Sequence, residues 1–373
     1  MSQLPGGRRP GVGSVWLTTA LLPVANLTLA LLLSAVVVLL VGESPLAALR
    51  LLAAGAFGNG EAIGYTLYYA TNFVFTGLAV AVAFHGGLFN IGAEGQANIA
   101  GLAVALLCLG AGAGPSLLVI PAAVVAAAAG GAAWAFVPAW LQAKRGSHVV
   151  ITTIMFNFIA SALMTHLLVN VLIKPGQQSP ETRELDPNTW LPHLHDVLRG
   201  LGWEIGSSPL NLSALFAVGA GVLVWFYLWH TRWGYELRAL GHNEAAAVYA
   251  GISPARTIIV AMSISGALAG LMALNEVLGV HHRLLLNMPG GAGYVGIAVA
   301  LMGRNHPVGI ALAAILFGAL YQGGSELSFD MPKLTRDMVV VIQGLIILVC
   351  GALENALRRP IEGLLRRPAR AEG

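Results

Sequence analysis

Long apolar runs separated by short polar stretches constrain this chain more than any other feature. A helix needs about 20 apolar residues to cross a bilayer. Runs that approach this length can be placed at 16–41, 63–84, 96–112, 116–142, 149–173, 209–231, 257–280, 292–303, 306–324 and 337–356. The third and eighth are short or interrupted by glycine. Because only 10% of the 373 residues are charged and 57% are hydrophobic, we predict an all-α polytopic membrane protein with about ten transmembrane helices.

Basic residues between the runs predict the orientation. If ten spans alternate from a cytoplasmic N-terminus, both Arg-rich ends and the loops containing Lys144, Arg232 and Arg304 lie on one side, as the positive-inside rule requires. Both termini are then cytoplasmic. The expected organisation is a cytoplasmic tail at 1–15, a transmembrane domain at 16–356 and a basic cytoplasmic tail at 357–373. The transmembrane domain contains an external loop at 174–208 and a cytoplasmic loop at 232–256.

Two segments of the chain resemble each other. The sequences "GQANIAGLAVAL" (95–106) and "GGAGYVGIAVAL" (290–301) are identical at seven of twelve positions. In the predicted topology the two copies cross the membrane in opposite directions. Inverted repeats that contain glycine-broken helices are typical of membrane transport pathways, so we predict such a pathway here.

The first copy begins in the polar stretch "GLFNIGAEGQ" (87–96). Glycine at 86, 87, 92 and 95 disfavours a continuous helix, so we expect a break, and lipid does not tolerate the unpaired backbone groups that a break leaves. Two interpretations stay open. The stretch is either a cytoplasmic turn, with Asn90 as N-cap and Glu94 near the positive end of the helix, or part of the pathway or its gate, and both can hold.

Other polar residues within the runs are weaker candidates. Asn157, in "TTIMFNFIAS", can donate and accept hydrogen bonds between helices. Asn275 and Glu276 fall near the outer end of an apolar run, where we expect their side chains to be solvated. We expect the same of residues 281–283, which follow in a loop. Cys108 and Cys350 lie in apolar runs without metal-ligand spacing, so we expect inert packing residues and no metal site. The candidate pathway residues are Phe89, Asn90, Glu94, Gln96 and Asn157.

The predicted cytoplasmic loop contains "GHNEAAAVYAGISP" (241–254). Asn243 can cap a helix, the small residues at 245–247 allow close approach of another backbone, and Pro254 can end the helix. A merely solvated connector is expected to carry more charge and less alanine. We therefore predict a short helix that docks in a groove of a partner protein.

Several stretches together resemble the permease subunits of bacterial ABC importers for nucleosides and simple sugars, within the branched-chain amino acid and ribose permease group. They are "GLFNIGAEGQ", "ITTIMFNFIAS", "LRALGHNEAAAVYAGI", "ISGALAGLMAL" and "GYVGIAVALMGRNHPVGI", and the resemblance covers about residues 60–345. It implies a type II importer fold, location in the bacterial inner membrane, a second permease subunit, two ATPase subunits and an external substrate-binding lipoprotein. It also implies that the ATPase is contacted by Asn243, Glu244, Ala245, Ala246, Tyr249 and Gly251.

The chain has no phosphate-binding loop of the Gly-Lys-Ser/Thr kind, because Lys144, Lys174 and Lys333 follow Ala, Ile and Pro. We therefore expect no enzymatic activity and no cofactor in this chain, with ATP and Mg²⁺ bound by a partner subunit. The leading interpretation is an ATP-driven nucleoside permease. The alternatives are a permease for a simple sugar, an ion-coupled secondary transporter in which Glu94 is the carrier, and an intramembrane enzyme, for which no paired carboxylates or Ser/His group is found.

Overall fold

The computed structural model describes residues 28–112, 114–174, 176–200, 202, 206–331, 333–334 and 336–352, which leaves both predicted tails and residues 16–27 of the first predicted span outside it. A helix over Thr28–Leu40 precedes the labelled elements. These are α2 (Pro45–Phe57), α3 (Gly60–His85), α4 (Ala93–Ala111), α5 (Ser116–Arg145), α6 (Val149–Asn170), η1 (Pro187–Thr189), α7 (Leu194–Gly200), α8 (Ser213–His230), α9 (Arg232–His242), α10 (Glu244–Tyr249), α11 (Pro254–Ala273), η2 (Leu274–His281), α12 (Ala292–Met302), α13 (Pro307–Asp330) and α14 (Arg336–Ala352).

The all-α membrane architecture is confirmed, but the count of ten spans is not. Among the described residues, seven helices are long and apolar enough to cross a membrane, and the number rises to eight if Thr28–Leu40 and α2 form one bent span. The predicted run at 292–303 contains only the 11-residue α12, because the chain before it is not helical. The part of the last run that is described, α14, has 17 residues.

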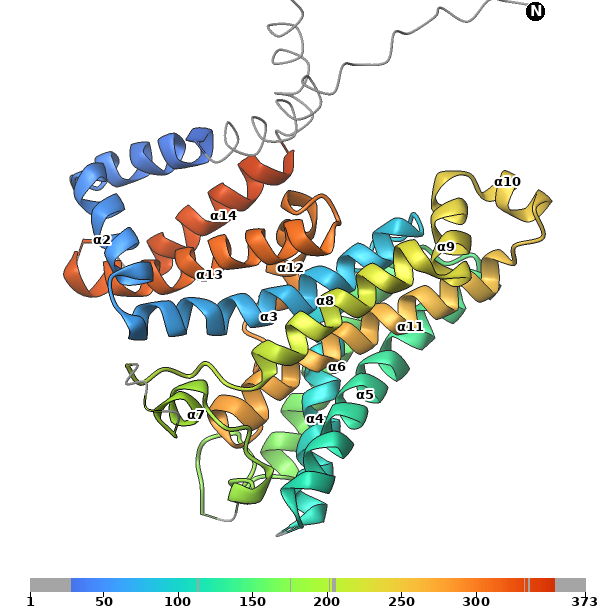
Figure 1. Ribbon diagram of the computed structural model, residues 1–373, viewed down its shortest axis with the longest axis horizontal. Helices are drawn as coiled ribbons and strands as arrows, with labels where there is room; N and C mark the ends of the chain where they lie inside the picture. The colour runs from blue at the N-terminus through green and yellow to red at the C-terminus, as the bar shows by residue number, and fades with distance from the viewer. Residues whose placement is uncertain are drawn as a thin grey trace, which may run out of the picture. The chain divides into compact units, whose positions relative to one another are not determined.

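The chain divides into two units, and the larger one, residues 50–326, contains the predicted pathway. Within it, α5 and α11 lie side by side (Figure 1). Glycine allows this close approach, since a Cβ added at Gly131 would lie 2.1 Å from the carbonyl oxygen of Gly266. Small residues at helix contacts are a common way to pack helices where lipid supplies no hydrophobic driving force.

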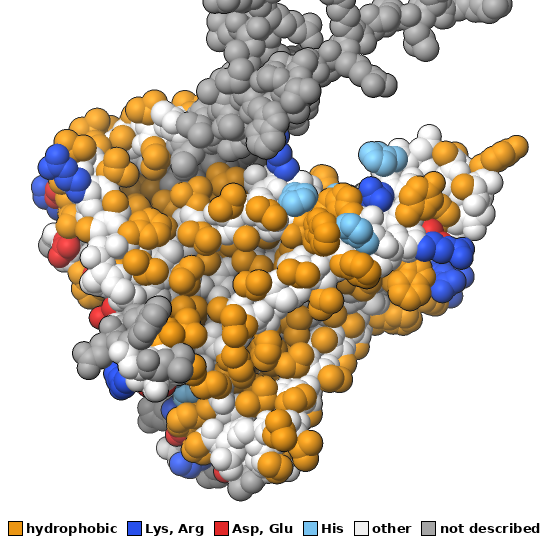
Figure 2. All heavy atoms as spheres, viewed as in Figure 1, with side chains coloured by type: hydrophobic (Ala, Val, Ile, Leu, Met, Phe, Trp, Pro, Cys, Tyr) orange, Lys and Arg blue, Asp and Glu red, His pale blue; other side chains and the backbone are white. Residues whose placement is uncertain are grey.

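Apolar side chains cover the outside of this unit. Leu117 on α5 is 85% exposed, Phe158 on α6 is 67% exposed and Leu223 on α8 is 69% exposed. Figure 2 shows hydrophobic side chains along the middle of α8, α11 and α5, with charged ones gathered near the helix ends. An apolar surface of this extent is expected where lipid surrounds a protein.

Helix α8 separates two polar parts of the larger unit. The connection from α6 to α8, which includes η1 and α7, lies at the N-terminal end of α8, whereas α9 and α10 follow its C-terminal end (Figure 1). Since α8 is long enough to span a membrane, the two polar parts at its ends lie on opposite sides of the membrane. We call them the loop side and the α10 side.

The smaller unit consists of residues 1–49 and 327–373. Within its described part, Lys333 Nζ lies 3.5 Å from Glu43 Oε1. Both side chains are partly exposed, so this ion pair contributes at most about 1 kcal/mol to stability.

Candidate functional site

The predicted break in the polar stretch is present. Helix α3 ends at His85, and the chain continues without regular helix until α4 begins at Ala93. The end of α3 lies on the α10 side, because a Cβ added at Gly241 of α9 would be 2.2 Å from the carbonyl oxygen of His85. The glycine content of this stretch was the signal that predicted the break.

A chain of hydrogen bonds shows how deep the stretch lies. Asn90 Nδ2 donates to Ser265 Oγ at 2.8 Å, and Ser265 Oγ donates to the carbonyl oxygen of Ala79 at 2.6 Å. Ala79 is six residues before the end of α3, which places it about 9 Å inside the span at 1.5 Å per residue. After α3 the chain therefore turns back into the bundle, and α4 begins inside it.

Asn90 and Gln96 bind each other across the break. Asn90 Nδ2 lies 3.0 Å from Gln96 Oε1, and Gln96 Nε2 lies 3.1 Å from Asn90 Oδ1. Asn90 Oδ1 also accepts the backbone N–H of Gly92 at 2.9 Å. Asn90 is therefore not the N-cap of α4, a position that Gly92 occupies without a side-chain cap. Both amides are completely buried, so they fix the shape of the break.

Asn157 of α6 holds the start of α4 from the other side. Its Oδ1 accepts the backbone N–H of Gly95 at 2.9 Å, and its Nδ2 donates to the carbonyl oxygen of Ile91 at 2.9 Å. Its Nδ2 also lies 3.3 Å from the hydroxyl oxygen of Tyr294 on α12. Asn157 thus satisfies backbone groups that the break leaves free, as a membrane interior requires.

Glu94 joins the two copies of the repeat. Its Oε1 accepts the backbone N–H of Gly291 at 2.8 Å, and its Oε2 accepts that of Gly293 at 2.9 Å. The carboxylate therefore lies at the positive N-terminal end of α12 rather than serving its own helix. A Cβ added at Gly293 would lie 2.3 Å from the backbone nitrogen of Glu94, so only glycine fits there.

Helices α4 and α12 run in opposite directions from this contact, as the inverted repeat predicts. The last turn of α4 is on the loop side, where Arg183 donates to the carbonyl oxygen of Leu109 at 3.2 Å. The chain after α12 is on the α10 side, where the His85 ring nitrogen lies 3.1 Å from the carbonyl oxygen of Asn305. We call this arrangement, made by residues 86–96 and 287–293, the junction.

The candidate pathway residues therefore meet at one place. The amide residues Asn90, Gln96 and Asn157 are buried, whereas Phe89 and Glu94 are half-buried. Phe89 packs edge-on against Phe84, with ring centroids 6.3 Å apart. A separate cavity of about 560 Å³ lies between α3, α8 and α13, but its lining is apolar except for Thr71 and contains none of these residues.

A second buried polar cluster was not predicted. The expectation that Asn275 and Glu276 are solvated is wrong, because they are only 1% and 5% exposed. Glu276 Oε1 accepts hydrogen bonds of 2.6 Å from both Tyr68 and Asn72 of α3, and its Oε2 lies 3.2 Å from His281 Nε2. The start of α8 covers the site as well, since Asn211 Nδ2 donates to Asn275 Oδ1 at 2.8 Å.

Residues 281–283, which were also expected to be solvated, are half-buried, and His282 and Arg283 pack against the connection between α6 and α8. The ring of His282 stacks on Trp190 at 3.9 Å, and Arg283 Nη1 lies 3.0 Å from Glu181 Oε1. Burial, reinforced by the nearby His193, lowers the pKa of His282. The loop side is therefore tied to the end of η2, which no local sequence pattern indicated.

The short helix predicted for the cytoplasmic loop is present as α10, whereas its docking to a partner stays a prediction. Asn243 Oδ1 accepts the backbone N–H of Ala246 at 3.0 Å, so Asn243 caps the helix. The helix ends at Tyr249, earlier than predicted, and Pro254 begins α11 instead. Only Ala247 of α10 is buried, and Tyr249 is 97% exposed. Glu244, Ala245, Ala246 and Gly251 are also exposed, so α10 presents a small, largely apolar surface.

The chain is similar to several transport permeases along most of its length. It is 36% identical to the guanosine ABC transporter permease protein NupP of Bacillus subtilis, over 87% of this chain and 92% of that protein. It is 33% identical to the nucleoside ABC transporter permease protein NupB of Lactococcus lactis, over 86% of this chain and 89% of that protein. It is 31% identical to the glucose ABC transporter permease protein TsgB13 of Haloferax volcanii, over 87% of this chain and 85% of that protein.

No solved structure matches the chain. The model of one protein family, described as the permease component of branched-chain amino acid transport systems, matches residues 62–350. This range includes the junction, the Glu276 cluster and α10. The chain therefore belongs to the family of permease components of branched-chain amino acid transport systems.

Proposed function

We propose that this chain is the membrane-spanning permease subunit of an ATP-driven importer for nucleosides. The observation that carries the proposal is the likeness to the guanosine and nucleoside permeases, at 36% and 33% identity over most of the chain. The junction supports a transport role, because broken helices in an inverted repeat are typical of transport pathways. Phe89 and Glu94, which are half-buried at the junction, are the residues that we propose line this route.

The proposal includes partners that this chain does not contain. Two ATPase subunits bind ATP and Mg²⁺, a second permease subunit completes the pathway, and an external lipoprotein delivers the substrate. The chain lies in the bacterial inner membrane with both termini in the cytoplasm, so the α10 side is cytoplasmic and the loop side is external.

A packed route connects α10 with the junction. Ala247 of α10 and Ile252 pack together with Ile258, which is in the second turn of α11. Two turns further along α11, Ser265 binds Asn90 at 2.8 Å. A displacement of α10 by a closing ATPase therefore reaches the junction through the rigid α11, and Asn90 is the first junction side chain to respond.

The proposal is tested by uptake of radiolabelled guanosine into cells that express the chain with its partner subunits. Uptake is expected to stop when ATP is depleted and to continue when an ionophore dissipates the ion gradients. The reverse result favours the ion-coupled transporter. The 31% identity to the glucose permease makes glucose the second candidate substrate, so competition by excess glucose but not by excess adenosine would contradict the nucleoside assignment.

Replacement of Asn90 by alanine is expected to lower guanosine uptake by about tenfold while the protein still reaches the membrane. The variant loses the hydrogen bonds to Gln96, Gly92 and Ser265, and each contributes about 1 kcal/mol. Asn170→Ala is the matched control, because the exposed Asn170 amide binds only within α6. Equal uptake by the two variants would remove Asn90 from the proposed machinery.

Replacement of Tyr249 by alanine tests the coupling surface. Tyr249 is 97% exposed, so its loss leaves folding unchanged, but the amount of ATPase that copurifies is expected to fall about fivefold or more, as for an interface residue worth ~1 kcal/mol. The control is Phe158→Ala, an aromatic residue that is 67% exposed on α6. If the amount of copurified ATPase falls with both variants, or with neither, the result argues against α10 as the ATPase contact.

A further inference from the structure

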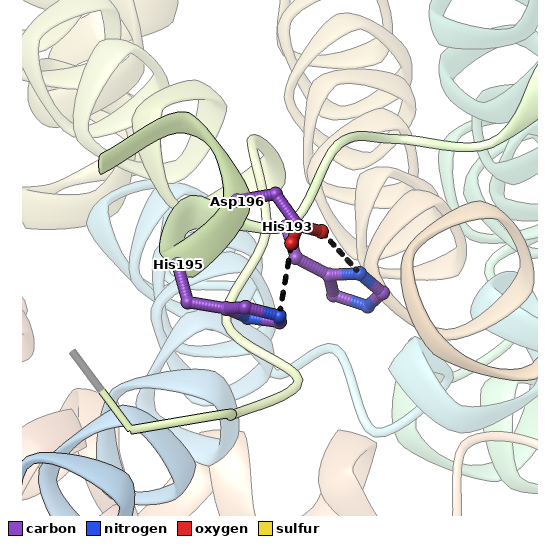
Figure 3. A group of neighbouring side chains, drawn as sticks. All are labelled: His193, His195 and Asp196. Atoms are coloured by element: carbon purple, nitrogen blue, oxygen red, sulfur yellow. Dashed lines mark ion pairs between the residues drawn. The ribbon is translucent and has the colours of Figure 1, made fainter. Parts of the chain in front are cut away.

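Three potential metal ligands lie close together on the loop side, within the four residues "HLHD" at 193–196. The ligand atoms of His193, His195 and Asp196 all lie within 4.8 Å of one another. Figure 3 shows the two imidazole rings on either side of the carboxylate. The expectation of no metal site was based on the two cysteines and did not consider these histidines.

The distances suit a shared ion better than direct hydrogen bonds. His195 Nε2 lies 3.3 Å from Asp196 Oδ1, and His193 Nδ1 lies 3.8 Å from Asp196 Oδ2. A charge-assisted hydrogen bond is about 2.7–2.9 Å long. Two ligand atoms bound at 2.0–2.1 Å to a tetrahedral zinc ion lie about 3.3 Å apart. His195 Nε2 and Asp196 Oδ1 already have this separation, whereas the three ligand atoms together spread over up to 4.8 Å, so the His193 ring moves toward the other two ligands when the ion binds.

The surrounding backbone holds the three residues in place. His193 pairs with Asn211 in an isolated antiparallel bridge. On either side of it, Leu194 N–H donates to the carbonyl oxygen of Leu210 at 2.7 Å, and Leu212 N–H donates to that of Pro192 at 3.1 Å. A preorganised backbone lowers the cost of gathering ligands around an ion.

A second contact selects the nitrogen of His195 that faces the ion. His195 Nδ1 lies 3.0 Å from the carbonyl oxygen of Ser208, which can only accept a hydrogen bond. The proton is therefore on Nδ1, and Nε2 is left with a free electron pair directed at Asp196. Metal-binding histidines commonly have a carbonyl oxygen on their other nitrogen in this way.

We propose that His193 Nδ1, His195 Nε2 and the Asp196 carboxylate bind one zinc-class divalent ion on the loop side, with the fourth position open to water. Two imidazoles and a carboxylate favour Zn²⁺ and similar transition metals over Mg²⁺ and Ca²⁺, which prefer oxygen ligands. The bound ion ties His193, which precedes α7, to His195 and Asp196 in the first turn of α7. This inference does not depend on the transported substrate.

The test uses the full chain, purified in detergent without a polyhistidine tag and stripped of metal by a chelator. Titration with Co²⁺ is expected to produce the visible absorption bands of tetrahedral cobalt with one ion per chain, and Zn²⁺ is expected to remove them. Zn²⁺ is also expected to raise the unfolding temperature, because it binds the folded state. No saturable binding of either ion would overturn the proposal.

Asp196→Asn and His195→Ala identify the ligands. Each replacement is expected to weaken Co²⁺ binding by more than about a hundredfold. Loss of a residue that only supports a metal ligand weakens binding by at most about a hundredfold. Asp196 is 56% exposed, so its replacement by the isosteric asparagine does not threaten folding. His166→Ala, an exposed histidine on α6, is the control and should bind normally. Unchanged binding by Asp196→Asn and His195→Ala would contradict the assignment even if the wild type binds cobalt.

Discussion

Replacement of Glu94 by alanine is expected to reduce guanosine uptake by at least about tenfold, even when the amount of protein in the membrane is unchanged. Glu94 accepts the backbone N–H groups of Gly291 and Gly293 at 2.8 and 2.9 Å. Each hydrogen bond to a charged group contributes about 1.5–3 kcal/mol, and no neighbouring helix residue can replace the acceptor. Without the carboxylate, the N-terminus of α12 separates from α4 and the junction loses its shape.

The comparison of Glu94→Ala with Glu94→Gln separates charge from shape. The glutamine oxygen can accept one of the two N–H groups, but its NH₂ group faces the other, so an intermediate loss of uptake is expected. The control is Glu61→Gln, an exposed carboxylate in the first turn of α3. Uptake should be normalised to the amount of each variant in the membrane. Wild-type uptake by Glu94→Ala would show that the contact between the repeat copies is not needed for transport.

The parts of the junction that were predicted depend on patterns visible in the sequence itself. Glycine at 86, 87 and 92 predicted the break between α3 and α4, and the identity between 95–106 and 290–301 predicted an inverted pair of helices. The same holds for Asn243, since a cap depends on residues three positions apart. The break and the cap are governed by backbone energetics within about one helical turn, whereas the repeat is visible when the chain is compared with itself.

The features that were missed depend on residues far apart in the chain. Hydropathy assigned a span to 292–303, but the helix there, α12, has 11 residues, fewer than the about 20 that cross a bilayer. Glu276 was expected to be solvated because it follows Asn275 near the end of an apolar run. Its burial comes from Tyr68 and Asn72, more than 200 positions earlier in the chain. Nothing within one helical turn of Glu276 indicates those partners.

Replacement of Glu276 by alanine is expected to lower the free energy of unfolding by about 3–5 kcal/mol, the usual cost of removing one partner from a buried charged group. The carboxylate accepts hydrogen bonds from Tyr68 and Asn72 at 2.6 Å and lies 3.2 Å from His281 Nε2. In the alanine variant these donors are left in a site that is almost closed to water. Thermal unfolding of the purified chain in detergent measures the loss.

Two further variants show whether this loss belongs to the buried cluster. Glu276→Gln keeps one acceptor oxygen and nearly the same volume, so it should be more stable than Glu276→Ala but less stable than the wild type. Glu236→Ala removes a carboxylate that pairs with Arg232 at 2.8 Å on the surface of α9, and such a pair contributes no more than about 1 kcal/mol. If Glu276→Ala unfolds at the same temperature as Glu236→Ala, the cluster does not hold α3, η2 and the start of α8 together. If Glu276→Ala instead has the lowest unfolding temperature of the three variants, the buried carboxylate is a main stabilising contact between helices on the loop side of the bundle.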